Sequence, residues 1–377
     1  MPKGALKNTL YRLALPICGL RPAWQPESAA QRILWRRKAV GACLQRFEAG
    51  RLSECVACGA ASLHPQRVPV APDTVFRGAS LAKMVTALLV FRLQTLGKLD
   101  VSEDARAFLP LRHAPRPVPL STLLSHTSGI RDTAAYHAAL GQSVPLERLL
   151  GPEAFWREPG EAFEYSNLAA GMIGSLLEAQ LSESFETLMQ RELFAPLGVE
   201  ATFDASLLAK TPVADGYRVL PPGRAFDARA RITSARPVSS PDPSLHYQLA
   251  AGNLYLTAAG LARLTLLAVD GHNGFLDGRS LRQLRTPVAA WPGEKSRMRH
   301  GMGLLVVDDP RLSSRRLWGH QGFAYGAVNG AFFDEEGNGY ALLTSGVSEQ
   351  RCGHMACVNR DFVRFFLSGR DGCDRRD

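Results

Sequence analysis

The stretch FRGASLAKMVTALLVF, residues 76–91, places Ser80 and Lys83 three positions apart at the head of an apolar run. Only seven of the 44 lysine and arginine residues of the chain are lysines, so a lysine here is unusual. On a helix, residues three apart lie on one face, where their side chains can touch. Serine needs a base to become a nucleophile. Lysine can be that base, because burial among apolar residues disfavours its charged form, whereas arginine stays protonated.

The same spacing has a second interpretation. S-x-x-K arises by chance roughly 0.4 times in a chain of this composition, and Lys83 could be a core lysine that extends its amine toward solvent. A position at the start of a helix favours the catalytic interpretation, because unsatisfied N–H groups gather there. The N–H of Ser80 could then form half of an oxyanion hole.

Two later stretches supply possible partners. EAFEYSNLAAGMIG contains Tyr165, which could relay protons, and Asn167, whose amide can bind both a lysine and a substrate carbonyl. The alternative is a helix start capped by Ser166 or Asn167. LWGHQGFAYG places His320 and Gly322 at the end of an expected strand, where glycine lets a ligand approach the backbone closely.

The elements that must position these residues follow a clear order. Residues 40–62 predict a hairpin with its turn at Ala49 and Gly50. A buried helix follows from residue 80 and ends at Gly97, and Thr257 is expected to cap another helix. Residues 301–345 predict strands, with EEGN as the last turn, before a final helix. Strands therefore come from both ends of the chain, and helices come from its middle.

This order predicts an α/β (α+β) fold with an inserted helical region. We expect an α/β lobe from 27–99 and 236–368, a mainly helical lobe at 100–235, a poorly ordered lead-in at 1–26 and a tail at 369–377. A long polar loop is expected at 219–244, where it would shape substrate choice. A cleft between the lobes is the natural place for a site.

Composition limits the classes of function. The chain has 377 residues, 46% hydrophobic and 21% charged, as in ordinary globular proteins. The net charge of +9 comes from scattered arginines, so no nucleic-acid partner is expected. Seven cysteines form no even framework, which favours reduced thiols and the cytoplasm. Cys55 and Cys58 form a CxxC, but an odd offset on a strand would put the two thiols on opposite faces, so they would not share a metal ion.

The first twenty residues allow one alternative. They combine a basic head with a short apolar patch that contains Pro16 and lacks a small-residue cleavage site. We expect a cytoplasmic protein without stable membrane insertion, with export as the alternative. The sequence does not indicate an oligomeric state.

Taken together, the ordered set SLAK (80–83), YSN (165–167) and HQG (320–322) resembles the serine β-lactamase-related family, which includes class C β-lactamases, penicillin-binding proteins and esterases. PGEAFEYSNLAAGMIG, LSTLLSHTSGI and AAGNLYLTAAGLARL also resemble stretches of this family, and the similarity covers roughly residues 40–365. It implies a β-lactamase/transpeptidase-like fold, with an antiparallel sheet flanked by helices.

The resemblance also implies roles. Ser80 would be the acylated nucleophile, Lys83 its base and Tyr165 a proton relay. Asn167 would orient the substrate, and His320 would stand where the family often has a lysine. The N–H groups of Ser80 and Phe323 would form the oxyanion hole. Acyl transfer of this kind requires no metal or cofactor.

One departure bears on the substrate. A fixed cation at position 320 would bind the carboxylate of a β-lactam, and a histidine supplies that charge only in part at neutral pH. We therefore expect a serine hydrolase acting on a small ester or amide. The alternatives are a β-lactamase or D-alanyl peptidase acting on penicillins or peptidoglycan, and a catalytically silent binding protein. His126, in LSHTSGI, is expected to be structural.

Overall fold

The computed structural model describes residues 24–140, 142, 144–208, 211, 213–220, 224–227, 242–293, 297–324 and 326–368. The expected lead-in is therefore described only from residue 24, and the expected tail lies outside the described residues. Among the described helices, none combines the length and the apolar character that crossing a bilayer requires.

The strands extend from β1 to β16 and the helices from α2 to α12. The strands are β1 Gly41–Glu48, β2 Arg51–Ser62, β3 Val68–Pro69, β4 Phe76–Arg77, β5 Ala201–Thr202, β6 Tyr217–Leu220, β7 Arg224–Asp227, β8 Tyr255–Leu256, β9 Pro287–Ala290, β10 Met298–Gly301, β11 Leu305–Val307, β12 Leu317–Ala324, β13 Ala327–Phe333, β14 Gly339–Gly346, β15 Arg351–Cys352 and β16 Met355–Ala356. The helices are α2 Ala29–Arg36, α3 Leu81–Thr95, α4 Leu120–Leu124, α5 Ala134–Ala139, α6 Asn167–Leu181, α7 Phe185–Met189, α9 Leu249–Gly252, α10 Ala258–Asp270, α11 Gly278–Arg285 and α12 Cys357–Leu367.

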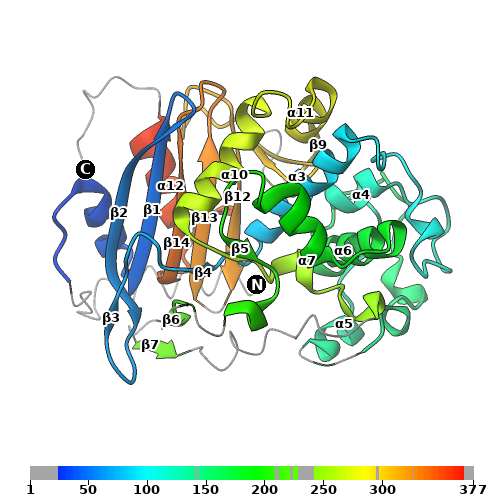
Figure 1. The fold of residues 1–377 in the computed structure, drawn as a ribbon, viewed down its shortest axis with the longest axis horizontal. Helices are drawn as coiled ribbons and strands as arrows, with labels where there is room; N and C mark the ends of the chain where they lie inside the picture. The colour runs from blue at the N-terminus through cyan, green and yellow to red at the C-terminus, as the bar shows by residue number, and fades with distance from the viewer. Residues whose placement is uncertain are drawn as a thin grey trace.

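The main sheet joins the two ends of the chain. Its strand order is β3-β2-β1-β14-β13-β12-β11-β10-β9, and neighbouring strands run antiparallel. The β1–β2 hairpin pairs with β14, so that Leu44 faces Leu342 across the two strands. This confirms the predicted fold class, an antiparallel sheet flanked by helices (Figure 1).

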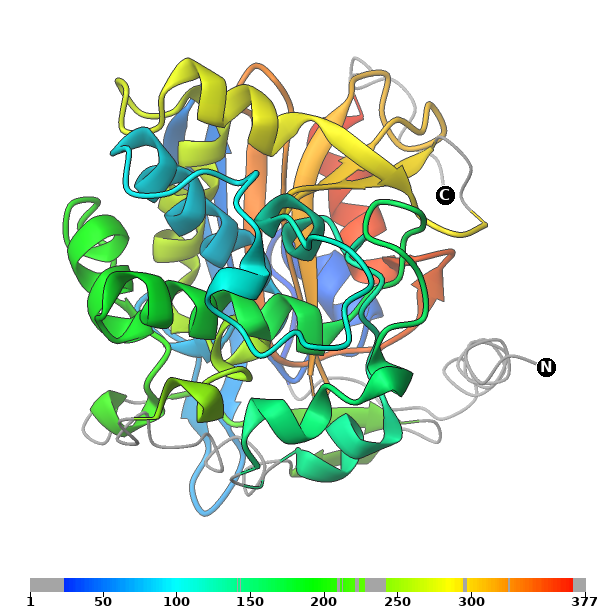
Figure 2. The same cartoon turned by 90° about the vertical axis from the view of Figure 1, so that its right-hand side faces the viewer.

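Helices cover both faces of this sheet, with a core on each. One large core contains the buried residues of α3 and α10, and a second contains those of α2 and α12. Figure 1 shows α10 in front of the strands and α12 behind them. Helices α4, α5, α6 and α7 gather beside the sheet, and they lie toward the viewer in Figure 2.

Several local predictions are confirmed. Helix α3 ends at Thr95, and Gly97 follows with a φ of 69°, a left-handed conformation that glycine adopts without strain. Thr257 caps α10 by accepting a hydrogen bond from the N–H of Gly260. In β2, Cys55 is exposed and Cys58 is buried, as expected for opposite faces of a strand.

The expected loop at 219–244 needs a correction at its start. Strands β6 and β7 form a hairpin in which Tyr217 faces Asp227 and Val219 faces Ala225. The prolines and glycine of the stretch favoured a loop, whereas Tyr217 and Val219 are both buried on one face, an alternation that favours a strand. Residues 228–241 of this segment lie outside the described residues.

Candidate active site

Ser80 lies where strand β4 turns into helix α3. It is the N-cap of that helix and is partly exposed, whereas Leu81 to Val90 are buried. The preceding Ala79 has a φ of 52°, which is rare for a residue with a Cβ. This tight turn leaves Ser80 accessible at the tip of a helix that is otherwise enclosed in the core.

Lys83 is 4% exposed and its amine reaches three oxygen atoms. The Nζ atom lies 3.3 Å from Ser80 Oγ, 2.9 Å from Asn167 Oδ1 and 2.6 Å from the carbonyl oxygen of Ala251. The predicted contact between Ser80 and Lys83 is therefore present. A contact from a distant segment, at Ala251, was not predicted.

Helix α6 brings the second pair of predicted residues to the lysine. Ser166 is its N-cap, and its hydroxyl accepts a hydrogen bond from the N–H of Ala169. Asn167, the first residue of the helix, therefore faces Lys83. The ring of Tyr165 lies just before the cap, with its centroid 5.1 Å from Lys83 Nζ. The capped helix start is thus present, and it brings Tyr165 and Asn167 to Lys83.

Strand β12 carries the third predicted set. A Cβ added at Gly322 would lie 2.4 Å from the Gly78 carbonyl oxygen and 3.2 Å from the Ser80 nitrogen. Glycine is therefore what allows β12 to approach the backbone of the nucleophile. His320, two residues earlier, is 2% exposed. Phe323 is partly buried, and the Arg351 guanidinium stacks on its ring at 3.9 Å.

Three buried histidines pack in a row next to Tyr165. The ring centroid of His126 lies 4.3 Å from that of Tyr165 and 4.9 Å from that of His300. The ring centroid of His300 lies 5.9 Å from that of His320. Burial lowers the pKa of His300 to about 4. Burial, and then the proximity of His300 and Lys83, holds the pKa of His320 well below its ordinary value. This shift disfavours the charged form of His320, so position 320 is a poor source of a cation near neutral pH.

His126 makes contacts that agree with the structural role expected from the sequence. Its Nδ1 atom accepts a hydrogen bond of 3.2 Å from the N–H of Ser166, and its carbonyl oxygen accepts one from the N–H of Glu164. It therefore supports the segment that carries Tyr165.

Sequence reasoning missed Asp132 and His300. Asp132 accepts a hydrogen bond from the side-chain amide of Asn167. His300 belongs to a layer of packed rings, which we call the ring layer, formed with Tyr165, His126 and His320. Asp132 follows the family-like stretch LLSHTSGI by two residues, which was the one available signal. His300 lies in RHGMG, where no spacing pointed to a site.

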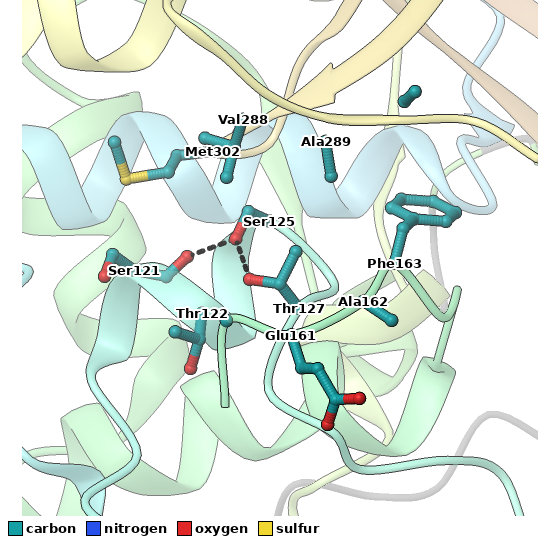
Figure 3. Close-up of a pocket in the computed structure, with 12 residues that line it drawn as sticks. Ser121, Thr122, Ser125, Thr127, Glu161, Ala162, Phe163, Val288, Ala289 and Met302 are labelled. Atoms are coloured by element: carbon teal, nitrogen blue, oxygen red, sulfur yellow. Dashed lines mark hydrogen bonds between the residues drawn. The ribbon is translucent and has the colours of Figure 1, made fainter. Parts of the chain in front are cut away.

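A pocket of about 580 Å³ adjoins the ring layer through Phe163 (Figure 3). Ser121, Ser125 and Thr127 line one side, and Val288 and Met302 line another. The Ser125 hydroxyl donates a hydrogen bond to the Ser121 carbonyl oxygen and shares another with the Thr127 hydroxyl. The pocket therefore has one polar wall and one apolar wall.

Phe163 is shared between this pocket and the ring layer. It lines the pocket, and its ring centroid lies 4.9 Å from that of Trp291 and 5.7 Å from that of His300. Trp291 also contacts Tyr165, at 5.7 Å between ring centroids. Within the described residues, no group of three or more His, Cys, Asp or Glu side chains is arranged to hold a metal ion.

Comparison with known proteins decides the family. A model of the Beta-lactamase family matches residues 27–356. The chain belongs to the beta-lactamase family. It is 27% identical over 374 residues to the esterase EstB of Burkholderia gladioli, an alignment that covers 88% of this chain and 92% of EstB.

Two further similarities concern a part of the chain and its fold. The chain is 31% identical over 146 residues to a D-aminopeptidase of Gluconobacter oxydans, covering 36% of this chain and 27% of that protein. The match thus spans little more than a quarter of the aminopeptidase. The fold is similar to that of EstCE1, described as a hydrolase with promiscuous acyltransferase activity, with a TM-score of 0.72 and 22% identity over 89% of this chain and 97% of that one.

Proposed function

We propose that this beta-lactamase family member hydrolyses a small, uncharged ester or amide through an acyl-enzyme on Ser80. The observation that carries the proposal is the position of Lys83 Nζ, 3.3 Å from Ser80 Oγ and 2.9 Å from Asn167 Oδ1. A buried amine within reach of a partly exposed serine hydroxyl is the arrangement that an activated nucleophile requires.

The proposed acylation uses the residues around Lys83. Lys83, assisted by Tyr165, takes the proton of Ser80 Oγ, and the oxygen attacks the carbonyl carbon of the substrate. The N–H groups of Ser80 and Phe323 stabilise the oxyanion that forms. The leaving alcohol or amine departs with a proton returned through Tyr165.

Hydrolysis then regenerates the enzyme. Water attacks the acyl carbon as its proton passes to the Tyr165–Lys83 pair, and the acid product leaves as Ser80 Oγ regains a proton. Asn167 holds the lysine and orients the substrate carbonyl through its amide.

The lowered pKa of His320 disfavours a substrate carboxylate at position 320. A β-lactam or a peptide ending in D-alanine brings a carboxylate, which needs a cation or several donors once it leaves water. Because burial lowers the pKa of His320, this residue does not supply the cation. The alignment with EstB, over 92% of that esterase, supports the same choice.

The test compares three substrates: p-nitrophenyl acetate, a chromogenic cephalosporin, and a peptide ending in D-alanyl-D-alanine whose cleavage is followed by the release of D-alanine. We expect kcat/KM for the acetate to exceed that for the cephalosporin by about 100-fold or more, the factor that about 3 kcal/mol of unpaired charge produces. Ser80→Ala should reduce ester hydrolysis by about a thousandfold or more. Preferred turnover of the cephalosporin or the peptide would establish the lactamase or peptidase alternative. Turnover of none would favour a silent binding protein.

A further inference from the structure

Asp132 holds the start of helix α6 through three hydrogen bonds. Its Oδ1 atom accepts from the Ser166 hydroxyl at 2.8 Å and from the N–H of Leu168 at 2.9 Å. Its Oδ2 atom accepts from Asn167 Nδ2 at 3.0 Å. Oδ1 thus accepts from the backbone and from the N-cap residue of the helix, and Oδ2 accepts from the side chain that contacts Lys83.

The bond to Oδ2 determines which way the Asn167 amide points. A carboxylate accepts hydrogen bonds and does not donate them, so it selects the NH₂ end of the amide. The oxygen end must then face Lys83, where it accepts a hydrogen bond of 2.9 Å from Nζ. Turning the amide over would set its NH₂ group against the amine and its oxygen against the carboxylate, leaving both contacts mismatched.

We propose that Asp132 is a positioning residue for the reaction, acting through Asn167 on Lys83. This inference rests on the proposed function. Asn167 Oδ1 and the Ala251 carbonyl oxygen are two of the three acceptors around Nζ, and the third is the nucleophile itself. Fixing the amide therefore fixes the position of the amine relative to Ser80 Oγ. Displacements of about 1 Å at such a contact reduce rates by about 100-fold.

A structural role for the same residue makes different predictions. If Asp132 served only as a cap for α6, its loss would lower the stability of the protein without changing the rate of the folded enzyme. The two roles use different oxygens of one carboxylate. Variants that alter one oxygen at a time can therefore separate them.

Asp132→Asn is the first variant, because its remaining oxygen can still accept from Ser166 and Leu168. Its new NH₂ group faces the NH₂ group of Asn167 and forces that amide to turn. We expect kcat for p-nitrophenyl acetate to fall by about 10- to 100-fold. KM should change less than twofold, and the melting temperature should stay close to that of the wild type. Asp132→Ser, whose shorter side chain cannot reach Asn167, should show the same loss of kcat.

The decisive variant is the double exchange Asp132→Asn with Asn167→Asp. It puts an NH₂ group at position 132 against a carboxylate at position 167, whose second oxygen can accept from Lys83. We expect it to recover at least about tenfold in kcat over either single variant. The single variant Asn167→Asp sets two carboxylates face to face and is the matched control.

Three outcomes would overturn the proposal. One is a folded Asp132→Asn protein with the kcat of the wild type, and another is a folded double variant no faster than its single variants. The third is a failure of both Asp132→Asn and Asp132→Ser to fold, which would make the residue structural. Failure of the proposed function would appear in the wild type itself. The wild type would then not hydrolyse the ester, or Ser80→Ala would hydrolyse it equally fast.

Discussion

At the scale of single residues, the sequence could predict the pairs that lie close along the chain. Ser80 and Lys83 share a helix face, and the spacing alone placed them in contact, as the 3.3 Å distance confirms. The third acceptor of Lys83 could not be predicted in this way. It is the main-chain oxygen of Ala251, 168 residues away, which a residue of any type would provide.

Gly322→Ala is the test at this scale. The added Cβ would lie 2.4 Å from the Gly78 carbonyl oxygen, so β12 or the turn before Ser80 must move. We expect hydrolysis of p-nitrophenyl acetate to fall by about 100-fold. Gly278→Ala is the control, because the nearest atom there is the flexible end of Arg282 at 3.3 Å. Equal activity of the two variants would contradict the close packing of β12 on the nucleophile.

At the scale of elements, the site depends on two helices that approach each other closely. A Cβ added at Gly171 in α6 would lie 1.5 Å from the carbonyl oxygen of Tyr247, just before α9. Because α9 carries Ala251, this close approach helps to bring the Ala251 oxygen to Lys83. Sequence patterns identified the α6 segment as helical, but periodicity does not reveal which distant segment packs on a glycine.

Gly171→Ala should therefore destabilise the protein and weaken the site together. We expect the free energy of unfolding in urea to fall by about 1–3 kcal/mol, the usual range for overpacking, with slower ester hydrolysis. Gly174→Ala on the same helix is the matched control. Its nearest neighbour is Ala250 Cβ at 3.4 Å, an ordinary contact, and alanine favours a helix by up to about 1 kcal/mol. Similar destabilisation by both would show that close packing at Gly171 is not the cause.

At the scale of the whole molecule, patterning predicted the architecture but not the charge of the buried site. Strands at both ends of the chain and helices in its middle predicted an α/β (α+β) architecture, and the family resemblance implied the antiparallel sheet flanked by helices. The charge of His320 depends on its surroundings, because burial, His300 and Lys83 lower its pKa together. These groups come from β12, β10 and α3, and only the folded chain brings them together.

The buried histidines also predict how stability depends on pH. His300 has a folded pKa of about 4 and an ordinary value of 6.5, so between these limits the unfolded chain binds the extra proton. Its contribution to the free energy of unfolding is present above about pH 6.5 and is lost as pH falls toward about 4. For His300 alone the loss is on the order of 3 kcal/mol.

Urea unfolding at several pH values between 4 and 7.5 would measure this dependence. His300→Gln removes the titrating group, so its stability should depend less steeply on pH than that of the wild type. His126 and His320 shift in the same direction and should leave a residual slope in the variant. An unchanged slope would show that His300 is not kept neutral by burial.

The most direct test of the central claim is the intact mass of the protein after treatment with a fluorophosphonate, which labels activated serines. We predict one adduct on the wild type, none on Ser80→Ala, and greatly slowed labelling of Lys83→Arg, because arginine has the charge of lysine but does not release a proton. Peptide mapping should place the adduct on Ser80. An unlabelled wild-type protein, or equal labelling of Ser80→Ala, would contradict the proposal that Ser80 is an activated nucleophile.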